Sequence, residues 1–194
     1  MTGRSYVHVK HATILIAIAA TGSCAVGRDP LAANGIAPVY NARSGRLEQL
    51  VSDRNGDGKI ETRAFMDGPL IKYIEIDRNG DHETDRWEFY LTSPNVIDHA
   101  EEANGVNRRV TRREFYSDGV IRRVADDVDS DGRPDKWERY DNGVLARVDL
   151  DLLGKGFASR RLVYAATGDV TRIEIDPDGD GVFVPVAAGT AKDW

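Results

Sequence analysis

The chain of 194 residues has a single cysteine, Cys24, and no apolar run long enough to cross a lipid bilayer. A lone cysteine excludes a framework of intrachain disulfides. The longest apolar run, residues 12–20, is less than half of the roughly 20 residues that a membrane-spanning helix needs. Aromatic residues make up only 8% of the chain, whereas 30% of its residues are charged. This composition predicts a thin fold without a large multilayer core.

Acidic residues are absent from the N-terminal segment. Residues 1–11 contain two basic residues and no Asp or Glu, and an apolar run and three small residues follow. A basic start, a short apolar run and small residues form the layout of a secretory signal. We therefore expect residues 1–23 to be a signal peptide and the protein to be exported.

The position of Cys24 resembles the lipobox of bacterial lipoproteins, in which a cysteine becomes the lipidated first residue of the mature chain. Gly22 and Ser23 fit that pattern, whereas Thr21 stands where the family usually has Leu. The resemblance implies that a lipid on Cys24 anchors the protein to a membrane. Ala25 replaces the Asp that resembles an inner-membrane retention signal, so we expect an outer-membrane or periplasm-facing lipoprotein, the cell surface included. The alternative is ordinary cleavage near Cys24, which leaves an incidental thiol.

Charge is distributed unevenly along the chain. All 32 acidic residues follow Cys24 and two of the 26 basic residues precede it, so the remainder carries a formal charge of about −8. This balance argues against a nucleic-acid partner and leaves room for cations. Residues 24–46 contain Gly, Pro, Ala and Asn without periodicity, and we expect them to form a lipid-anchored tether. The folded domain is then residues 47–194.

An internal repeat dominates residues 47–194. Acidic loops begin at Asp53, Asp77, Asp127 and Asp176, and the two larger separations, 50 and 49 residues, are about twice the first, which is 24. A period of about 24 to 26 residues predicts two further units, near positions 103 and 151. Thirteen positions after five of the unit starts stand Met66, Tyr90, Tyr116, Tyr140 and Tyr164. We infer six units, the last of them truncated.

Each unit has the pattern of a β-hairpin. After the loop that begins at Asp127, the short aromatic segment 136–140 precedes Asp-Asn-Gly at 141–143, and residues 144–150 alternate apolar and polar. The predicted fold is all-β, an antiparallel meander of about six 24–26-residue β-hairpin repeats with roughly ten to twelve strands. We expect an open or partly rolled twisted sheet, because neither the strand lengths nor the polarity indicate the filled lumen of a barrel.

The acidic loops carry the ligand pattern of a calcium site. Ca²⁺ takes about six to eight oxygen ligands, and carboxylate or amide oxygens at loop positions 1, 3 and 5 surround one ion when Gly at position 6 permits a sharp turn. Position 7 would contribute a backbone carbonyl and position 9 a further carboxylate. The candidate ligands are Asp53, Asn55, Asp57, Lys59, Glu61, Asp77, Asn79, Asp81, Glu83, Asp85, Asp127, Asp129, Asp131, Arg133, Asp135, Glu138, Asp176, Asp178, Asp180 and Val182. We expect up to four structural Ca²⁺ ions.

The loop Asp127–Glu138 matches the EF-hand loop in full, with Glu138 at position 12. A helix-loop-helix is excluded, because the repeat period leaves no room for two helices and Pro134 at position 8 lacks the N–H that joins paired EF-hand loops. The loops resemble the wider group of Asp-x-Asp-x-Asp-Gly calcium loops of thrombospondin type 3 repeats, dockerins and FG-GAP propellers. The whole repeat resembles the tandem Asp-Gly/Trp-Glu/Tyr repeats of bacterial lipoproteins, which implies a surface protein without an assigned activity. A solvated Asx turn is the alternative for any single loop.

These observations favour an exported structural or binding protein over an enzyme. His82 and His99 have no evident Ser or Cys partner, so a hydrolase is the less favoured alternative. Another alternative is a cell-surface module that binds a glycan or a protein through an aromatic stripe on the sheet. That stripe would comprise Trp87, Tyr90, Tyr116, Trp137, Tyr140 and Tyr164. Cross-strand packing is the structural explanation for the same rings.

Overall fold

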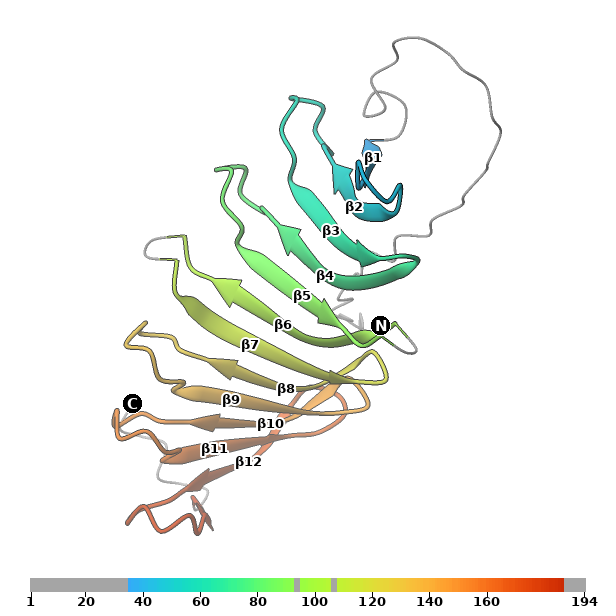
Figure 1. Cartoon of the computed structure of the whole chain (residues 1–194). Coiled ribbons are helices and arrows are strands. Elements are labelled where there is room, and N and C mark those ends of the chain that lie inside the picture. The colour runs from blue at the N-terminus through green and yellow to red at the C-terminus, as the bar shows by residue number, and fades with distance from the viewer. Residues whose placement is uncertain (1–34, 93–94, 106–107, 187–194) are drawn as a thin grey trace, which may run out of the picture.

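The described part of the chain is one antiparallel β-sheet (Figure 1). The computed structural model describes residues 35–92, 95–105 and 108–186, and its 13 strands are hydrogen-bonded in chain order. The strands are β1 (Ile36–Tyr40), β2 (Leu47–Ser52), β3 (Thr62–Asp67), β4 (Leu70–Ile76), β5 (Arg86–Tyr90), β6 (Ile97–Ala103), β7 (Val110–Ser117), β8 (Val120–Asp126), β9 (Lys136–Asp141), β10 (Val144–Leu150), β11 (Arg160–Tyr164), β12 (Val170–Ile175) and β13 (Val184–Pro185). The predicted all-β meander with an open sheet is confirmed. The described residues contain no helix long and apolar enough to cross a membrane.

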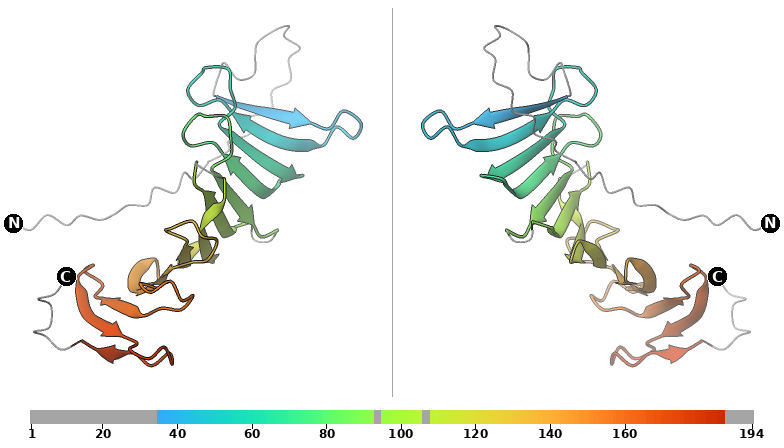
Figure 2. Two further views of the ribbon diagram at one scale, coloured as in Figure 1. Left: turned by 90° about the vertical axis from the view of Figure 1, so that its left-hand side faces the viewer. Right: turned by 90° about the vertical axis from the view of Figure 1, so that its right-hand side faces the viewer.

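The sheet is a single twisted layer. In the two side views, the last strands are turned well away from the direction of the first (Figure 2), as the right-handed twist of β-strands requires when it accumulates over many strands. All the described strands belong to this one sheet, and no helix accompanies them. Within residues 35–92, 95–105 and 108–186, each face is therefore covered only by its own side chains and by the connecting loops.

The first hairpin lies in the segment for which we predicted a tether. β1 pairs with β2 along its whole length, so the sheet begins within residues 24–46 and has 13 strands instead of ten to twelve. A signal for this hairpin exists in the sequence, because Tyr40 stands 26 residues before Met66 and continues the tyrosine series. The predicted signal peptide and Cys24 lie outside the described residues.

Tight turns and long acidic loops alternate along the meander. Two hairpins turn through pairs of residues with positive φ, Asp118 and Gly119 at 52° and 73°, and Asn142 and Gly143 at 49° and 79°. Two left-handed residues in succession form the turn whose twist matches that of the flanking strands. Since neighbouring strands are antiparallel and consecutive, the tight turns fall on one side of the sheet and the acidic loops on the other (Figure 1).

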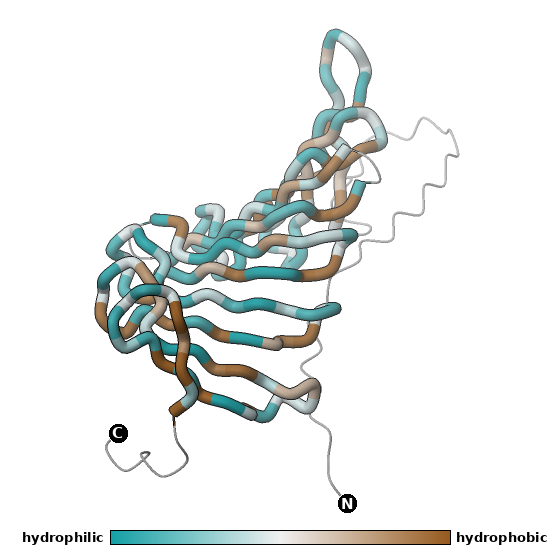
Figure 3. The backbone as a smooth tube through the Cα atoms, turned by 90° about the horizontal axis from the view of Figure 1, so that it is seen from below, coloured by the Kyte–Doolittle hydropathy of each residue, from teal (hydrophilic) through white to brown (hydrophobic). Residues whose placement is uncertain are grey.

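Hydrophobic and hydrophilic residues alternate along the strands and so divide between two faces of the sheet (Figure 3). One face, here named the glutamate face, has a central row formed by Ile74, Glu88, Ala100, Glu114, Val124, Glu138 and Val148. The apolar members of this row are at most 5% exposed. Glu114 and Glu138 are only 8% exposed. Carboxylates therefore lie within the best-covered part of the sheet.

Each glutamate of this row has a cation two residues before it and a tyrosine two residues after it, on the same face of its strand. Arg112 Nε lies 2.9 Å from Glu114 Oε1, and the Tyr116 hydroxyl donates to Glu114 Oε2 over 2.8 Å. The equivalent triplets are Arg86, Glu88 and Tyr90 on β5 and Lys136, Glu138 and Tyr140 on β9. The three triplets repeat one arrangement on alternate strands.

Ion pairs also join the triplets across the sheet. Arg86 Nη2 on β5 lies 2.9 Å from Glu114 Oε2 on β7, so this pair spans the intervening strand above Ala100. On the other side, Arg112 Nη1 lies 2.8 Å from Asp126 on β8. Ala100 is completely buried in a single-layer sheet because these long charged side chains cover it.

The partners of these carboxylates outweigh the cost of their burial. Burial disfavours ionised Glu114, but the hydrogen bond from Arg112 and the charge of Arg86 hold its pKa below the usual range. The pKa of Glu138 is lowered in the same way, against the effect of burial, by its own cation and tyrosine. Burial and the hydrogen bond to Glu114 raise the pKa of Tyr116 to about 12.

The opposite face, here named the ring face, carries a second cross-strand row. Its members are Phe65, Tyr73, Phe89, His99, Phe115, Arg123, Arg139 and Arg147. Phe65 stacks on Tyr73 with ring centroids 4.2 Å apart. Phe89 stacks on His99 at 4.4 Å. These rings face one another, which agrees with cross-strand packing as their role.

Replacement of Glu114 by Gln removes the charge between Arg86 and Arg112 while the side-chain shape is kept. We expect Glu114→Gln to lower the free energy of unfolding by about 2–3 kcal/mol, because two largely covered cations lose their counter-charge. Glu101→Gln is the control: Glu101 pairs at 3.0 Å with the exposed Arg113 on the ring face, and loss of such a pair costs less than about 1 kcal/mol. Urea unfolding followed by circular dichroism measures both. Equal losses would contradict the dependence of the sheet on the glutamate face.

Tyr116 sets an alkaline limit on stability. Because its pKa is raised in the folded protein, its contribution is complete below the ordinary value of about 10 and is lost as the pH rises through about 12. We expect Tyr116→Phe to make the loss of stability above about pH 10 shallower. Tyr40→Phe, at an edge residue that is 58% exposed, should leave the profile unchanged. Denaturant midpoints measured from neutral to alkaline pH test this, and identical profiles for Tyr116→Phe and wild type would refute it.

Candidate metal centres

Five loops on one side of the sheet share a backbone plan. They follow β2, β4, β8, β10 and β12 and begin at Asp53, Asp77, Asp127, Asp151 and Asp176, all of them buried. In each loop the carboxylate of this first aspartate accepts the N–H of position 6 over 2.5–2.9 Å. It also accepts a second N–H, from position 3, 4 or 5. The first aspartate is thus a structural cap of its loop.

Positions 4 and 6 of every loop have positive φ. Position 4 is Gly in all the loops except the third, where it is Ser130 with a φ of 62°. Position 6 is Gly in all the loops except the second, where it is His82 with a φ of 75°. The departure of His82 from the sequence pattern therefore leaves the loop backbone unchanged. Lys59 Nζ lies 2.6 Å from His82 Nε2, which links the first loop to the second.

Positions 7 and 9 also have repeated roles. The residue at position 9 accepts the backbone N–H of position 2 over 2.7–3.2 Å, and the acceptors are Glu61, Asp85, Asp135 and Ser159. The predicted position 7 ligands donate their N–H to the aspartate at position 5, and they are Lys59, Glu83, Arg133 and Val182. Their backbone therefore lies beside the predicted side-chain ligands.

The loop that begins at Asp151 builds this frame without the other acidic residues. Leu153 and Lys155 occupy its positions 3 and 5, and Ser159 takes position 9. Asp151 still accepts the N–H of Leu153 over 3.1 Å and that of Gly156 over 2.5 Å. Acidic residues at positions 3 and 5 are consequently not required to form the loop.

Three loops gather carboxylates at one point. The groups are Asp53, Asp57 and Glu61; Asp127, Asp129 and Asp135; and Asp176, Asp178 and Asp180, and in each the ligand oxygens lie within 4.8 Å of one another. Ionised carboxylates at this spacing repel one another, and a divalent cation among them removes that repulsion. An all-oxygen donor set of this kind suits Ca²⁺ or Mg²⁺ rather than a transition metal.

The second group shows that the loop frame leaves oxygens available for an ion. Asp129 Oδ1 accepts the N–H of Asp131 over 3.1 Å, and Asp135 Oδ2 accepts that of Val128 over 2.9 Å. Within the described residues, the other oxygen of Asp129 and of Asp135 accepts no hydrogen bond. Asp129 and Asp135 therefore each use one oxygen for the loop and keep the other for a ligand, whereas both oxygens of Asp127 accept backbone N–H groups.

The loop that begins at Asp77 does not gather its carboxylates in this way. Asn79 Nδ2 donates to Asp81 Oδ2 over 3.1 Å and to Asp85 Oδ1 over 3.4 Å, and so bridges two carboxylates. In the first loop, Asn55 Nδ2 donates to Asp57 alone, over 3.3 Å. Burial disfavours ionised Asp77, but backbone N–H groups, with Gly80 first among them, outweigh burial and lower its pKa. Three of the four predicted loops thus present a carboxylate cluster.

The structure removes Glu138 from the predicted ligand set. Its carboxylate lies on the glutamate face, where Lys136 Nζ and the Tyr140 hydroxyl each approach it to 2.6 Å. Position 12 lies on a helix in an EF-hand, but here the loop ends at Asp135 and position 12 falls within β9. The resemblance to an EF-hand is therefore limited to the loop and does not extend into β9.

The predicted aromatic stripe is divided between the two faces. Trp87 and Trp137 lie on the ring face, opposite Glu75 and Ala125 on the neighbouring strands. Three tyrosines donate their hydroxyls to the glutamates of the other face, and these are Tyr90, Tyr116 and Tyr140. Tyr164 continues the same alternation on β11. The six residues do not form one surface.

No protein-family model matches the sequence, and no curated protein matches it. Among solved structures, the chain is similar to part of an S. aureus TarM mutant in complex with fondaparinux, alpha-GlcNAc-glycerol and UDP, with a TM-score of 0.33 and 13% identity over 58% of this chain and 19% of that one. It is also similar to part of the accessory secretory protein 1, 2 and 3 structure from Streptococcus pneumoniae, with a TM-score of 0.29 and 16% identity over 64% of this chain and 20% of that one. The chain spans about a fifth of the length of either structure. Scores this low carry no conclusion about function.

Loss of the cap should destabilise even the loop that has no carboxylate cluster. We expect Asp151→Ala to lower the free energy of unfolding by about 1–2 kcal/mol, because two backbone N–H groups of the loop lose a charged acceptor. Lys155→Ala is the control within the same loop and should change stability by less than about 0.5 kcal/mol. Urea unfolding with and without calcium measures both variants. A cost for Asp151→Ala that appears only with calcium would contradict the structural role of the cap.

Proposed function

We propose that the protein is an exported, lipid-anchored scaffold without catalytic activity, whose single-layer sheet is stabilised by calcium. The observation that carries the calcium part is the contrast between loops of one backbone plan. Three loops add clustered carboxylates to a frame that the loop at Asp151 builds without them. Charge that a loop does not need for its own folding is accounted for by a bound cation.

Calcium suits the place of these loops in the fold. Each cluster lies where one hairpin ends and the next begins, so a bound ion would hold two neighbouring hairpins together. A site in free calcium at ten times its Kd contributes about 1.4 kcal/mol. Extracellular calcium modules commonly bind at about 10⁻⁴–10⁻³ M, so the environment would fill such sites permanently. The role is therefore structural and not that of a signalling switch.

The other parts of this proposal rest on sequence and on local contacts. The N-terminal segment supports export, attachment through a lipid on Cys24 and an outer-membrane or surface location. Both described histidines serve contacts within the sheet and loops: His99 stacks on Phe89 and lies 2.8 Å from Asp98, and His82 contacts Lys59. These contacts favour a scaffold over a hydrolase.

Isosteric substitution separates the ion from the loop frame. Asp127 itself is unsuitable, because its removal also breaks two backbone hydrogen bonds. Asp129→Asn combined with Asp135→Asn removes two of the three clustered charges and keeps an acceptor oxygen for the N–H groups that these residues bind. We expect calcium to raise the Tm of the full-length protein by roughly 3–6 °C for each filled site. In the double variant, the calcium-dependent rise in Tm should be smaller by the contribution of one site.

Thermal unfolding in EDTA, in magnesium and in calcium makes this measurement. Mg²⁺ is the ion control, since it demands octahedral geometry and gives up its water reluctantly. Asp118→Asn combined with Asp141→Asn removes the same charge from exposed positions at two tight turns and should keep the full shift. An unchanged Tm of the wild type in calcium would reduce the clusters to acidic turns.

A further inference from the structure

Three arginines stand side by side on the ring face. Arg139 on β9 lies opposite Arg123 on β8 and opposite Arg147 on β10. Like charges directly opposite each other on neighbouring strands are destabilising. Arg123 is partly accommodated over the ring of Phe115, 4.9 Å from its centroid. This contact does not account for the positive charges of Arg139 and Arg147.

Too few carboxylates surround this arginine row. Arg123 and Arg139 form no ion pair with any residue that the structure describes. Arg147 Nη2 lies 2.9 Å from Asp149, but Asp149 is shared with Arg161, whose Nε lies 2.7 Å away. Arg147 Nε is buried and has no hydrogen-bond partner in the described part of the chain. Burial, together with the charges of Arg161 and Arg139, lowers the pKa of Arg147 in spite of Asp149.

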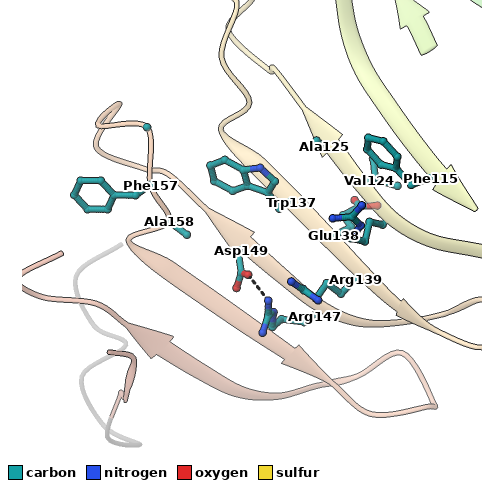
Figure 4. Close-up of a pocket in the computed structure, with 12 residues that line it drawn as sticks. Phe115, Val124, Ala125, Trp137, Glu138, Arg139, Arg147, Asp149, Phe157 and Ala158 are labelled. Atoms are coloured by element: carbon teal, nitrogen blue, oxygen red, sulfur yellow. Dashed lines mark ion pairs between the residues drawn. The ribbon is translucent and has the colours of Figure 1, made fainter. Parts of the chain in front are cut away.

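The arginine row borders a groove of about 320 Å³. Its lining includes Phe115, Arg123, Trp137, Arg139, Arg147 and Phe157. Figure 4 shows the rings of Trp137 and Phe157 at one part of this site and the guanidinium groups of Arg139 and Arg147 beside Asp149 at another. The volume is at the lower end of the range of small-molecule pockets, and rings with a few charged groups are their usual lining.

Phe157, which lines the groove, is held against the next loop. A Cβ atom on Gly179 would lie 2.8 Å from the ring of Phe157, so the absence of a side chain there lets this ring pack against the next loop. Phe157 belongs to the loop that begins at Asp151, which has Lys155 in place of an aspartate at position 5. The loop beside the arginine row is therefore the one without a carboxylate cluster.

We propose that this groove binds an acidic sugar residue of a polysaccharide. Arg139 and Arg147 pair with the carboxylate or sulfate group of the sugar through their planar guanidinium groups. Trp137 packs against the apolar C–H face of the sugar ring. Asp149 accepts sugar hydroxyl groups, because a carboxylate has about four acceptor positions and its two arginines do not use them all.

Other classes of ligand fit less well. Double-stranded DNA is disfavoured because its sugar–phosphate backbone offers no hydroxyl donors to Asp149. A neutral sugar would leave the arginine row uncompensated. An acidic sugar offers an anionic group to the arginines, a C–H face to the indole of Trp137 and hydroxyl groups to the carboxylate of Asp149.

Binding of defined saccharides to the full-length protein in calcium tests this inference. Hyaluronan tetrasaccharide supplies carboxylates, sulfated dextran supplies sulfates, and unmodified dextran is the neutral control. We expect the acidic saccharides to change the tryptophan fluorescence and neutral dextran to leave it unchanged. Trp137→Phe should abolish the fluorescence change, because this indole contacts the sugar ring.

Arginine variants separate the groove from general attraction by charge. Arg139→Ala should weaken binding by at least about tenfold, since a charge-assisted pair is lost. The Tm of this variant should not fall, because Arg139 forms no ion pair with the residues that the structure describes. Arg122→Ala removes the same charge on β8 but from the glutamate face, where Arg122 contacts Asn142, and should change affinity by less than about twofold. The saccharide affinity of Arg139→Lys should lie between those of Arg139→Ala and Arg122→Ala.

Failure of both acidic saccharides to bind at millimolar concentration would overturn the proposal. Equal weakening by Arg122→Ala and Arg139→Ala would overturn it as well, and tighter binding of double-stranded DNA would reassign the groove. This test is independent of the calcium proposal. Asp129→Asn combined with Asp135→Asn should keep saccharide binding, and Arg139→Ala should keep the calcium-dependent rise in Tm.

Discussion

The buried glutamates of one sheet face are the constraint on which this structure depends. A single layer has no second layer to cover its apolar residues, and in this protein long charged side chains take that place. The pair between Arg86 and Glu114 covers Ala100 and requires three strands to be in register at once. Buried ion pairs add little net stability compared with apolar packing, but a slip by one residue would turn every member of the row to the opposite face. The network therefore specifies the pairing of the strands as much as it stabilises them.

In the acidic loops, the residues that hold the backbone differ from those at positions 3 and 5 that could bind an ion. The first aspartate and the residue at position 9 hold the backbone, whatever stands at positions 3 and 5. Each junction between hairpins can consequently carry a full cluster, as at Asp127, or an amide donor among its carboxylates, as at Asp77, or no cluster, as at Asp151. Since the frame does not change, a cation bound as proposed would strengthen some junctions without altering the geometry of the sheet.

Features that follow from local sequence were predictable, and features that depend on register were not. The spacing of the acidic loops and turns such as Asn142-Gly143 predicted the hairpins, because turn chemistry acts between neighbours in the chain. The hairpin β1–β2 escaped prediction because its segment lacks an acidic loop and contains Pro38, although Tyr40 continues the series. Glu138 was assigned to the ion by a pattern from helical proteins, whereas its strand turns it to the glutamate face. The arginine row becomes visible only once the strands are paired.

Stabilising contacts elsewhere in the sheet explain why the fold tolerates the arginine row. The glutamate face and the acidic loops supply stability, and cross-strand rings cover the ring face from Phe65 to Phe115. Beyond Phe115 the pairing of rings ends, since three like charges stand opposite one another, an arrangement that is destabilising. Local violations of this kind are expected at functional sites, where the rest of the fold offsets their cost. The ring face between β8 and β10 is therefore where an anionic ligand has the most free energy to contribute, because no carboxylate in the described part of the chain forms an ion pair with Arg123 or Arg139.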